Sequence, residues 1–222
     1  MKALMRIELK KMSLKGQIRG MVVANMIIFF LLTTIFVTEG VPEIEAFEIV
    51  DVIIKAVFLI WQSVLISKLI VSEFKERTIQ QLCTYPLNRS NVMSAKVGLI
   101  FVIMLGFIWV TQLIQHSLFS GLSLILPEFN YALNLQIIGI IALTSLFTVM
   151  VGMLPIAVGL WMKSTIAPVI TSFLIISVLG GSFGDASLDL LNNLIGMLMM
   201  GAVGMAFAGF VIRDVLKKDL IV

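Results

Sequence analysis

The side chains of this chain that could do chemistry inside its long apolar runs are amides and hydroxyls. Gln62 and Ser63 interrupt one such run, and Gln112 and Gln115 interrupt the next. An amide offers both donors and an acceptor without the cost of placing a charge among apolar groups. Such groups prefer to face a neighbouring helix or a water-filled path. Two interpretations therefore stay open: a translocation path lined by these side chains, or hydrogen bonds that hold helices together with no substrate role.

The common catalytic and metal-binding patterns are absent from the sequence. It contains no GxxxxGK[ST] loop for nucleotide phosphates and no GxSxG nucleophile elbow. His116 is the single histidine, which excludes an HExxH zinc site, and Cys83 is the single cysteine, which excludes an intrachain disulfide. We expect His116 to be an interfacial or packed residue rather than a ligand. We also expect no carboxylate deep within a span, no metal site and no catalytic residue.

Composition assigns the chain to the membrane proteins. Hydrophobic residues make up 59% of it and charged residues 13%, whereas soluble domains carry about 25% charged residues. The net charge of +3 does not indicate nucleic-acid binding, because the basic residues segregate by membrane side, as shown below. The predicted fold class is all-α and polytopic, with residues 1–222 forming a single transmembrane domain.

The apolar runs predict six spans, each near the roughly 20 residues that cross about 30 Å of hydrocarbon. The fourth is long and contains Pro155, and the fifth is short and contains Pro168. A five-span count is the alternative, since only Lys163 and Ser164 separate the fourth run from the fifth. The predicted spans are Met21–Thr38, Val52–Val71, Val97–Leu118, Leu135–Trp161, Thr165–Leu179 and Leu194–Ile212.

Charge distribution favours six spans with both termini in the cytoplasm. In that topology all of the 16 basic residues except Lys55 fall on the cytoplasmic side, as the positive-inside rule requires. Lys55 stands one turn from Asp51, with which it can pair at the interface. Most acidic residues fall on the outer side. We therefore expect a multi-pass protein of the cell membrane, most simply a bacterial plasma membrane.

Two segments at the edges of the spans have patterns of their own. In residues 1–20 the apolar residues Met5, Leu9 and Met12 recur at helical spacing opposite basic residues, which predicts an amphipathic helix on anionic lipid. The alternative is a positive flank that only orients the first span. Residues 180–193 predict an outer glycine turn followed by a short helix.

The longest polar stretch runs from Ser72 to Lys96, between the second and third spans. Ser72 can cap a short helix, and Glu73 and Arg77 stand four apart in the order that favours a helix. Pro86 then marks a turn. This pattern predicts a compact helical segment held against the membrane surface, and the alternative is a solvated connector.

The whole pattern resembles the membrane subunit of type-2 ABC transporters, the exporter-type permeases. The basic start, the six spans, the cytoplasmic ends and the short loops all fit that family. The most specific likeness lies in the polar stretch, although Arg77-Thr78 stands where many members have Gly-Thr. The residues that match the family pattern there are Glu73, Thr78, Ile79, Leu82, Pro86, Arg89 and Lys96.

The resemblance implies a mechanism and a set of partners. In this family the segment is a coupling helix that docks into a cytoplasmic ATP-binding subunit, which holds ATP and Mg, so this chain would bind no cofactor and would not be an enzyme. A second copy or a sister permease would complete the path, and the cargo would be an antimicrobial peptide, a lipid or a hydrophobic drug. The docking residues it implies are Glu73, Phe74, Lys75, Glu76, Arg77, Thr78, Ile79, Gln80 and Leu82.

Two other functions stay open on the sequence. A membrane subunit that anchors an ATPase for sensing, without moving cargo, would use the same docking segment. A stand-alone polytopic enzyme is the weaker alternative, because the spans lack the catalytic groups it would need.

Overall fold

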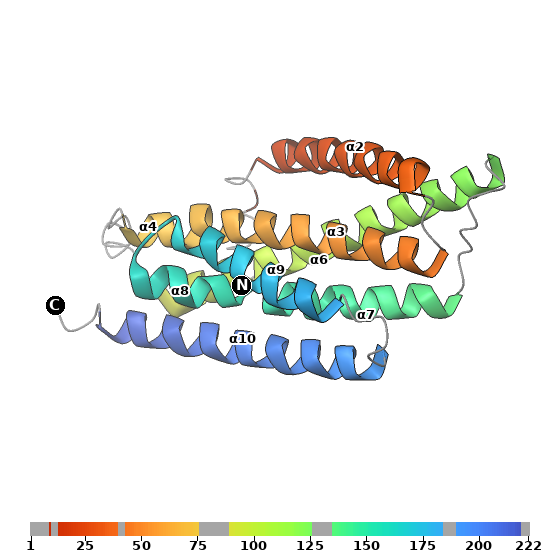
Figure 1. The fold of residues 1–222 in the computed structure, drawn as a ribbon. Helices are drawn as coiled ribbons and strands as arrows, with labels where there is room; N and C mark the ends of the chain where they lie inside the picture. The colour runs from red at the N-terminus through yellow and green to blue at the C-terminus, as the bar shows by residue number, and fades with distance from the viewer. Residues whose placement is uncertain are drawn as a thin grey trace.

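The computed structural model describes residues 9, 13–39, 43–75, 89–125, 135–183 and 190–218, and within them all regular structure is helical. The all-α prediction is therefore confirmed for this part of the chain. The helices lie roughly along one direction as a bundle (Figure 1). They are α2 (Leu14–Glu39), α3 (Glu43–Ile66), the π-helix η1 (Ser67–Val71), α4 (Ser72–Lys75), α6 (Arg89–Ile125), α7 (Leu135–Val151), α8 (Leu154–Met162), α9 (Ala167–Phe183) and α10 (Leu190–Lys218).

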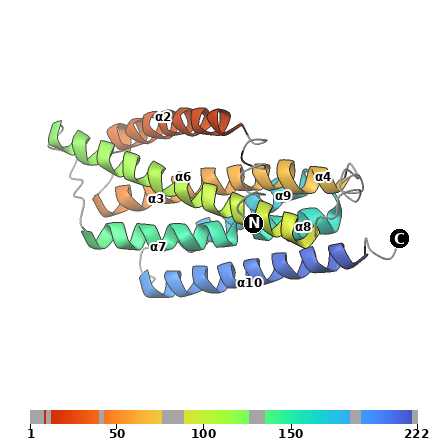
Figure 2. The ribbon, with the colours of Figure 1, turned by 180° about the vertical axis from the view of Figure 1, so that it is seen from behind.

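The centre of the bundle is formed by α3, α6, α7 and α8, with α2 along one edge and α10 along the opposite edge (Figures 1 and 2). Helix α10 packs on α7 and α8, and α9 packs on α3 and α8. The largest fully buried side chains include Phe58 of α3, Phe119 of α6 and Leu32 of α2. The ring of Phe119 lies 5.4 Å from the rings of both Phe29 and Phe36, so aromatic contacts join α2 to α6.

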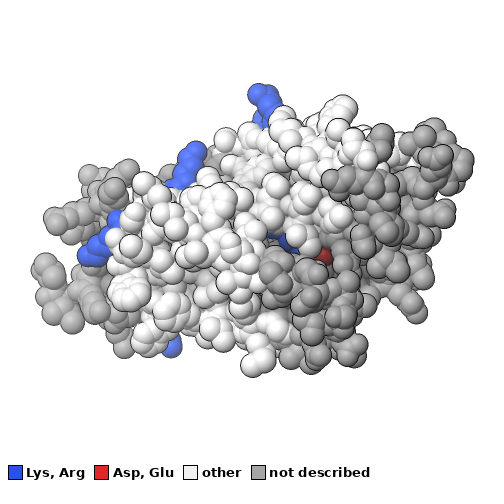
Figure 3. All heavy atoms as spheres, in the orientation of Figure 1, with Lys and Arg blue, Asp and Glu red and all other residues white. Residues whose placement is uncertain are grey.

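Four helical segments are long and apolar enough to cross a membrane: Leu14–Phe36, Ile49–Val71, Val92–Ser123 and Ile141–Met162. Ala167–Val178 and Leu198–Arg213 are shorter apolar helical segments, so the count of six spans stays a prediction. In the space-filling view most of the described surface is uncharged, as expected for lipid contact (Figure 3). One adjoining pair of blue and red atoms shows in the middle of that face.

Several helix ends differ from the sequence prediction. Helix α3 begins at Glu43, so most of the predicted outer loop before Val52 is helical, and α6 begins at Arg89, before the predicted start of the third span. Helix α9 continues through Phe183, so the predicted glycine turn at Gly180 is helical. Hydropathy marks only the part of a helix that lies in hydrocarbon, whereas the helix itself continues into the polar interface.

Some predictions fall on residues outside the described part of the chain. Most of the predicted amphipathic helix at 1–20 lies there, while residues 14–20 belong to α2. Residues 76–88 of the predicted coupling segment and 184–189 of the predicted outer helix lie there as well. The amphipathic helix, the coupling segment beyond Lys75 and the outer short helix therefore stay predictions.

The predicted fourth span is two helices rather than one. Helix α7 ends at Val151, and α8 begins at Leu154 with Pro155 in its first turn. Pro155 has no N–H to donate to the carbonyl of Val151, which is the physical reason for the break. Just before it, the N–H of Met153 bonds the carbonyl of Met150 at 3.1 Å, three residues back. The carbonyl of Val149, four residues before Met153, thereby loses its usual α-helical partner.

Small residues allow α10 to approach its neighbours closely. Gly201, Gly204 and Ala208 are buried on the side that faces the bundle. A Cβ on Gly204 would lie 3.2 Å from the carbonyl oxygen of Met150 and 3.0 Å from Leu154. Gly204 and Ala208, four residues apart, form the small-xxx-small pattern that permits close approach between membrane helices.

Candidate functional site: buried polar contacts and the α4 junction

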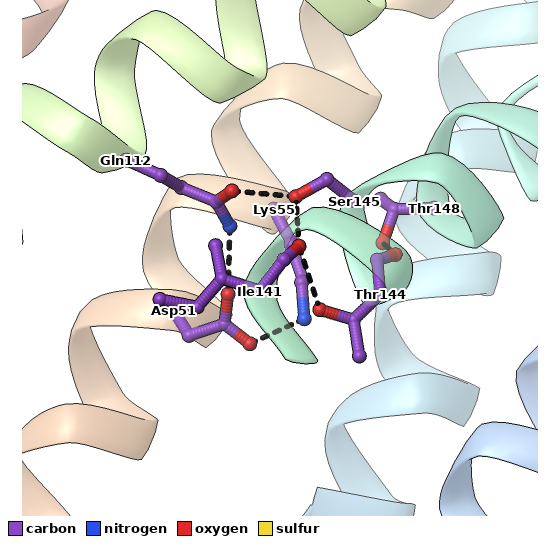
Figure 4. Close-up of polar contacts among 7 residues, drawn as sticks. All are labelled: Asp51, Lys55, Gln112, Ile141, Thr144, Ser145 and Thr148. Atoms are coloured by element: carbon purple, nitrogen blue, oxygen red, sulfur yellow. Dashed lines mark hydrogen bonds and ion pairs between the residues drawn. The ribbon is translucent and has the colours of Figure 1, made fainter. Parts of the chain in front are cut away.

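A charged cluster of Asp51, Lys55, Gln112 and Ser145 joins three helices (Figure 4). Lys55 Nζ donates to Asp51 Oδ2, and Gln112 Nε2 donates to Asp51 Oδ1 at 2.8 Å. Ser145 Oγ lies 2.5 Å from Gln112 Oε1 and donates to it. The contacts therefore run from α3 through α6 to α7, and both carboxylate oxygens of Asp51 have a donor.

The cluster lies near the start of an apolar helical segment, so the expectation that no carboxylate lies deep within a span stays a prediction. Asp51 and Lys55 both fall inside the segment Ile49–Val71, and Lys55 is only 4% exposed. The predicted pairing of the two is confirmed. The Asp51 carboxylate, whose side chain is 15% exposed, is tolerated here because an ammonium four residues away and an amide from α6 replace much of its hydration.

A second polar contact, the amide cluster of Asn25, Thr111 and Gln115, joins α2 to α6. Asn25 Nδ2 donates to Thr111 Oγ1 at 3.0 Å, and Gln115 Nε2 donates to the backbone carbonyl of Asn25 at 2.8 Å. All three residues are buried. Together with the aromatic contacts of Phe119 and the bond from Trp61 Nε1 to Gln17 Oε1 at 2.9 Å, these bonds join α2 to the bundle.

Gln62 of α3 donates a hydrogen bond to a backbone carbonyl at the break between α7 and α8. Its Nε2 donates to the carbonyl of Val149 at 3.0 Å, which is the carbonyl that the break deprives of its α-helical partner. Gly152 makes room for this contact, because a Cβ there would lie 2.3 Å from Gln62 Oε1. Beside it, Ser63 Oγ donates to Ser172 Oγ at 3.1 Å and ties α3 to α9.

The four residues predicted to line a path are thus all buried, and each bonds another helix. Gln62 and Ser63 contact the α7–α8 break and α9, while Gln112 and Gln115 belong to the charged and amide clusters. These contacts are the hydrogen bonds between helices that one of the two sequence interpretations expected. Their role as a translocation path stays a prediction.

The α4 junction, formed by Glu73, Lys96 and the carbonyl of Leu69, lies where the polar stretch leaves the bundle. Lys96 of α6 donates to the Glu73 carboxylate and, at 3.3 Å, to the Leu69 carbonyl. Ser72 does not cap a new helix as predicted, because α3 continues through η1 into α4 without a break. Its hydroxyl instead donates to the carbonyl of Lys68 at 2.5 Å.

The remaining predicted docking residues are described only in part. Phe74 and Lys75 belong to α4, but their side chains lie outside the described part of the structure. The others, which also lie outside it, are Glu76, Arg77, Thr78, Ile79, Gln80 and Leu82.

His116 is a packed residue, as one of the two sequence interpretations expected. It is 2% exposed, and its ring stacks on Phe47 at 4.8 Å. Within the described residues, no group of three or more His, Cys, Asp or Glu side chains is arranged to hold a metal ion.

Sequence reasoning missed Asn25, Ser172 and the burial of Lys55. A usable signal existed for Asn25, because it is the single amide in an apolar run of the first span. No such signal marks Ser172, whose partner Ser63 lies 109 residues away in the sequence.

Comparisons with known proteins found a matching family and a similar sequence. Residues 4–180 match the family described as ABC-2 family transporter protein. A relative from Bacillus subtilis (strain 168), named Uncharacterized protein YcbO, is 31% identical over 235 residues, covering 97% of this chain and 99% of the relative. No solved structure gives a significant match.

Proposed function

Since this chain belongs to the ABC-2 family of transporter proteins, we propose that it is the permease subunit of an ATP-driven exporter. A separate cytoplasmic subunit binds and hydrolyses ATP with Mg, and this chain carries the membrane path. Two copies of the chain, or this chain and a sister permease, form the transporter in a cell membrane with both termini in the cytoplasm.

The observation that carries the proposal is the connection between α3 and α6. These are central helices of the bundle, and both contain segments long and apolar enough to span a membrane. The polar stretch between them begins with α4, which continues from α3 through η1 without a break, and it ends in the first turns of α6. A subunit that pushes on this stretch would act on both helices at once, with no flexible linker at the α3 end.

The proposed cargo is amphipathic or lipid-like. The described interior offers amides, hydroxyls, the imidazole of His116 and two paired lysines, Lys55 with Asp51 and Lys96 with Glu73. An ion would need several groups free to replace its hydration shell, whereas among the described buried amides only the side-chain oxygens of Gln62 and Gln115 lack a hydrogen-bond partner. A hydrophobic or amphipathic molecule that slides along the apolar faces of the helices makes no such demand.

The test is ATP-driven cargo movement in inside-out vesicles from the native membrane, in which export appears as uptake. We expect ATP-dependent uptake of a labelled cationic amphipathic peptide or a labelled lipid. Arg77→Glu in the coupling segment should abolish uptake, whereas Lys163→Glu, at an exposed lysine of the α8–α9 turn, should not. Equal uptake with and without ATP, or in Arg77→Glu and wild type, would count against the proposal.

A second candidate is the non-transporting subunit that anchors an ATPase. The extensive bonding of the buried polar side chains favours it, because a rigid bundle suffices for an anchor. ATP hydrolysis by the bound subunit that responds to Arg77→Glu, with no movement of either probe, would select this function.

A further inference from the structure

The end of α3 contains a π-helical turn, η1, immediately before the coupling segment. The N–H of Ser72 bonds the carbonyl of Ser67, five residues back, where an α-helix would use the carbonyl four residues back. The Lys68 carbonyl receives the Ser72 hydroxyl instead. Single π turns inside α-helices are rare and frequently occur at functional sites.

Lys96 of α6 connects to this turn at two points. Its ammonium donates to the Leu69 carbonyl within η1 and to the carboxylate of Glu73 in α4. The Lys96 side chain is 5% exposed and the Glu73 side chain 18% exposed. Both bonds are charge-assisted, so they are stronger than bonds between neutral groups. One buried side chain therefore holds both the π turn and the helix that follows it.

Two further contacts fix η1 to the rest of the bundle. Ser67 Oγ donates to the carbonyl of Thr165 in the α8–α9 turn. Val71 packs against Gly159 of α8, where a Cβ would lie 2.8 Å from Val71 Cγ2. The π turn is thus bonded or packed against α6, α8 and the α8–α9 turn, and α4 is its only extension out of the bundle in the described residues.

We propose that Lys96 is the positioning residue of the coupling segment, an inference that rests on the proposed function. Lys96 fixes the direction in which α4 leaves η1, so that a push on the coupling segment moves α3 and α6 together instead of bending the chain at Ser72. Glu73 then serves as the partner of Lys96 and not as a contact to the ATPase, which changes its role from the one the family resemblance implied.

The first test needs no ATPase and uses Cys83, the single cysteine, which stands in the coupling segment. A nitroxide label on Cys83, in the full chain in lipid nanodiscs, reports how tightly the segment is held. Glu73→Gln keeps the bond from Lys96 to Leu69 but removes the ion pair, and Lys96→Met removes both. We expect the immobile part of the spectrum to decrease in Glu73→Gln and to be lost in Lys96→Met.

Two control variants separate positioning from loss of charge. Lys96→Arg can make both bonds and should keep the wild-type spectrum. Lys68→Gln removes a positive charge from an exposed side chain of the same turn and should also leave the spectrum unchanged. A wild-type spectrum in Glu73→Gln and Lys96→Met would overturn the proposal, as would a spectrum of Lys96→Arg that matches Lys96→Met.

The second test adds the ATP-binding subunit that co-purifies from the native membrane. Lys96→Met should still bind that subunit but should lose the change in the Cys83 spectrum that ATP causes in the wild type. Loss of subunit binding in Lys96→Met would make Lys96 a docking residue and overturn the proposal. If no ATP-binding subunit co-purifies with the wild type, the proposed function fails, while the first test still decides whether Lys96 holds the segment.

Discussion

Replacing Asp51 by Asn should be among the most damaging single changes to the bundle. Asp51 accepts from Lys55 through Oδ2 and from Gln112 through Oδ1. An Asn side chain has an NH2 group in place of one carboxylate oxygen, so either the ammonium or the amide would face another donor instead of an acceptor. In addition, the ammonium of Lys55, a residue that is 4% exposed, would remain buried without its counter-charge.

The expected size follows from the burial of the pair. Removing one partner of a buried ion pair costs about 3–5 kcal/mol, because the other charge stays uncompensated. We therefore expect Asp51→Asn to lower the free energy of unfolding by an amount in this range. Lys55→Met should cost less, because Asp51 is partly exposed and keeps the bond from Gln112.

The double variant Asp51→Asn/Lys55→Met provides the decisive control. With no charge left, the amide oxygen introduced in place of the Asp51 carboxylate can accept from Gln112 Nε2. The apolar thioether side chain introduced in place of Lys55 fills the space of the lysine stem. Neutral replacements of buried ion pairs are often tolerated. The double variant should therefore be more stable than Asp51→Asn alone.

The assay is unfolding by sodium dodecyl sulfate in mixed micelles, followed by the fluorescence of the three tryptophans. A cost below about 1 kcal/mol for Asp51→Asn, the level of an exposed ion pair, would refute the reasoning. A double variant whose cost equals the sum of the two single costs would refute it as well.

Two further predictions concern the other buried contacts, with unfolding measured in the same assay. Gly152→Ala should lose about 1–3 kcal/mol through overpacking, because its Cβ would lie 2.3 Å from Gln62 Oε1. The control is Gly106→Ala, because nothing lies within 4 Å of a Cβ at that position. This variant should be as stable as the wild type or more stable by up to about 1 kcal/mol. Equal effects of Gly152→Ala and Gly106→Ala would show that the contact with Gln62 is not the cause. Asn25→Ala should cost about 0.6–1.7 kcal/mol for each bond lost between helices, and it should raise protease cleavage before α2. If Thr111→Val, which removes the acceptor of Asn25, leaves stability unchanged, the bond to Asn25 contributes nothing.

The sequence predicted the class of this fold because the signals for it are local. Long apolar runs and few charges indicate membrane helices without any knowledge of their packing. The close approach of α10 also has a local signal, because Gly204 and Ala208 stand one turn apart on a single helix face.

The contacts that the sequence could not supply have a common physical cause, since they join distant segments. The sequence shows that Asp51 can pair with Lys55, but it does not show that Gln112, 61 residues away, supplies a second donor. The break at Gly152 could be anticipated from Pro155, but Gln62, the residue that bonds the freed carbonyl, could not be chosen among the polar residues of other spans.

Purification in mild detergent from the native membrane tests whether this permease works with a separate ATP-binding subunit. We expect an ATP-binding subunit to co-purify in stoichiometric amount, and we expect Arg77→Glu, in the coupling segment, to release it while Lys163→Glu does not. A chain that purifies alone, with ATP and Mg present, would rule out the proposed function.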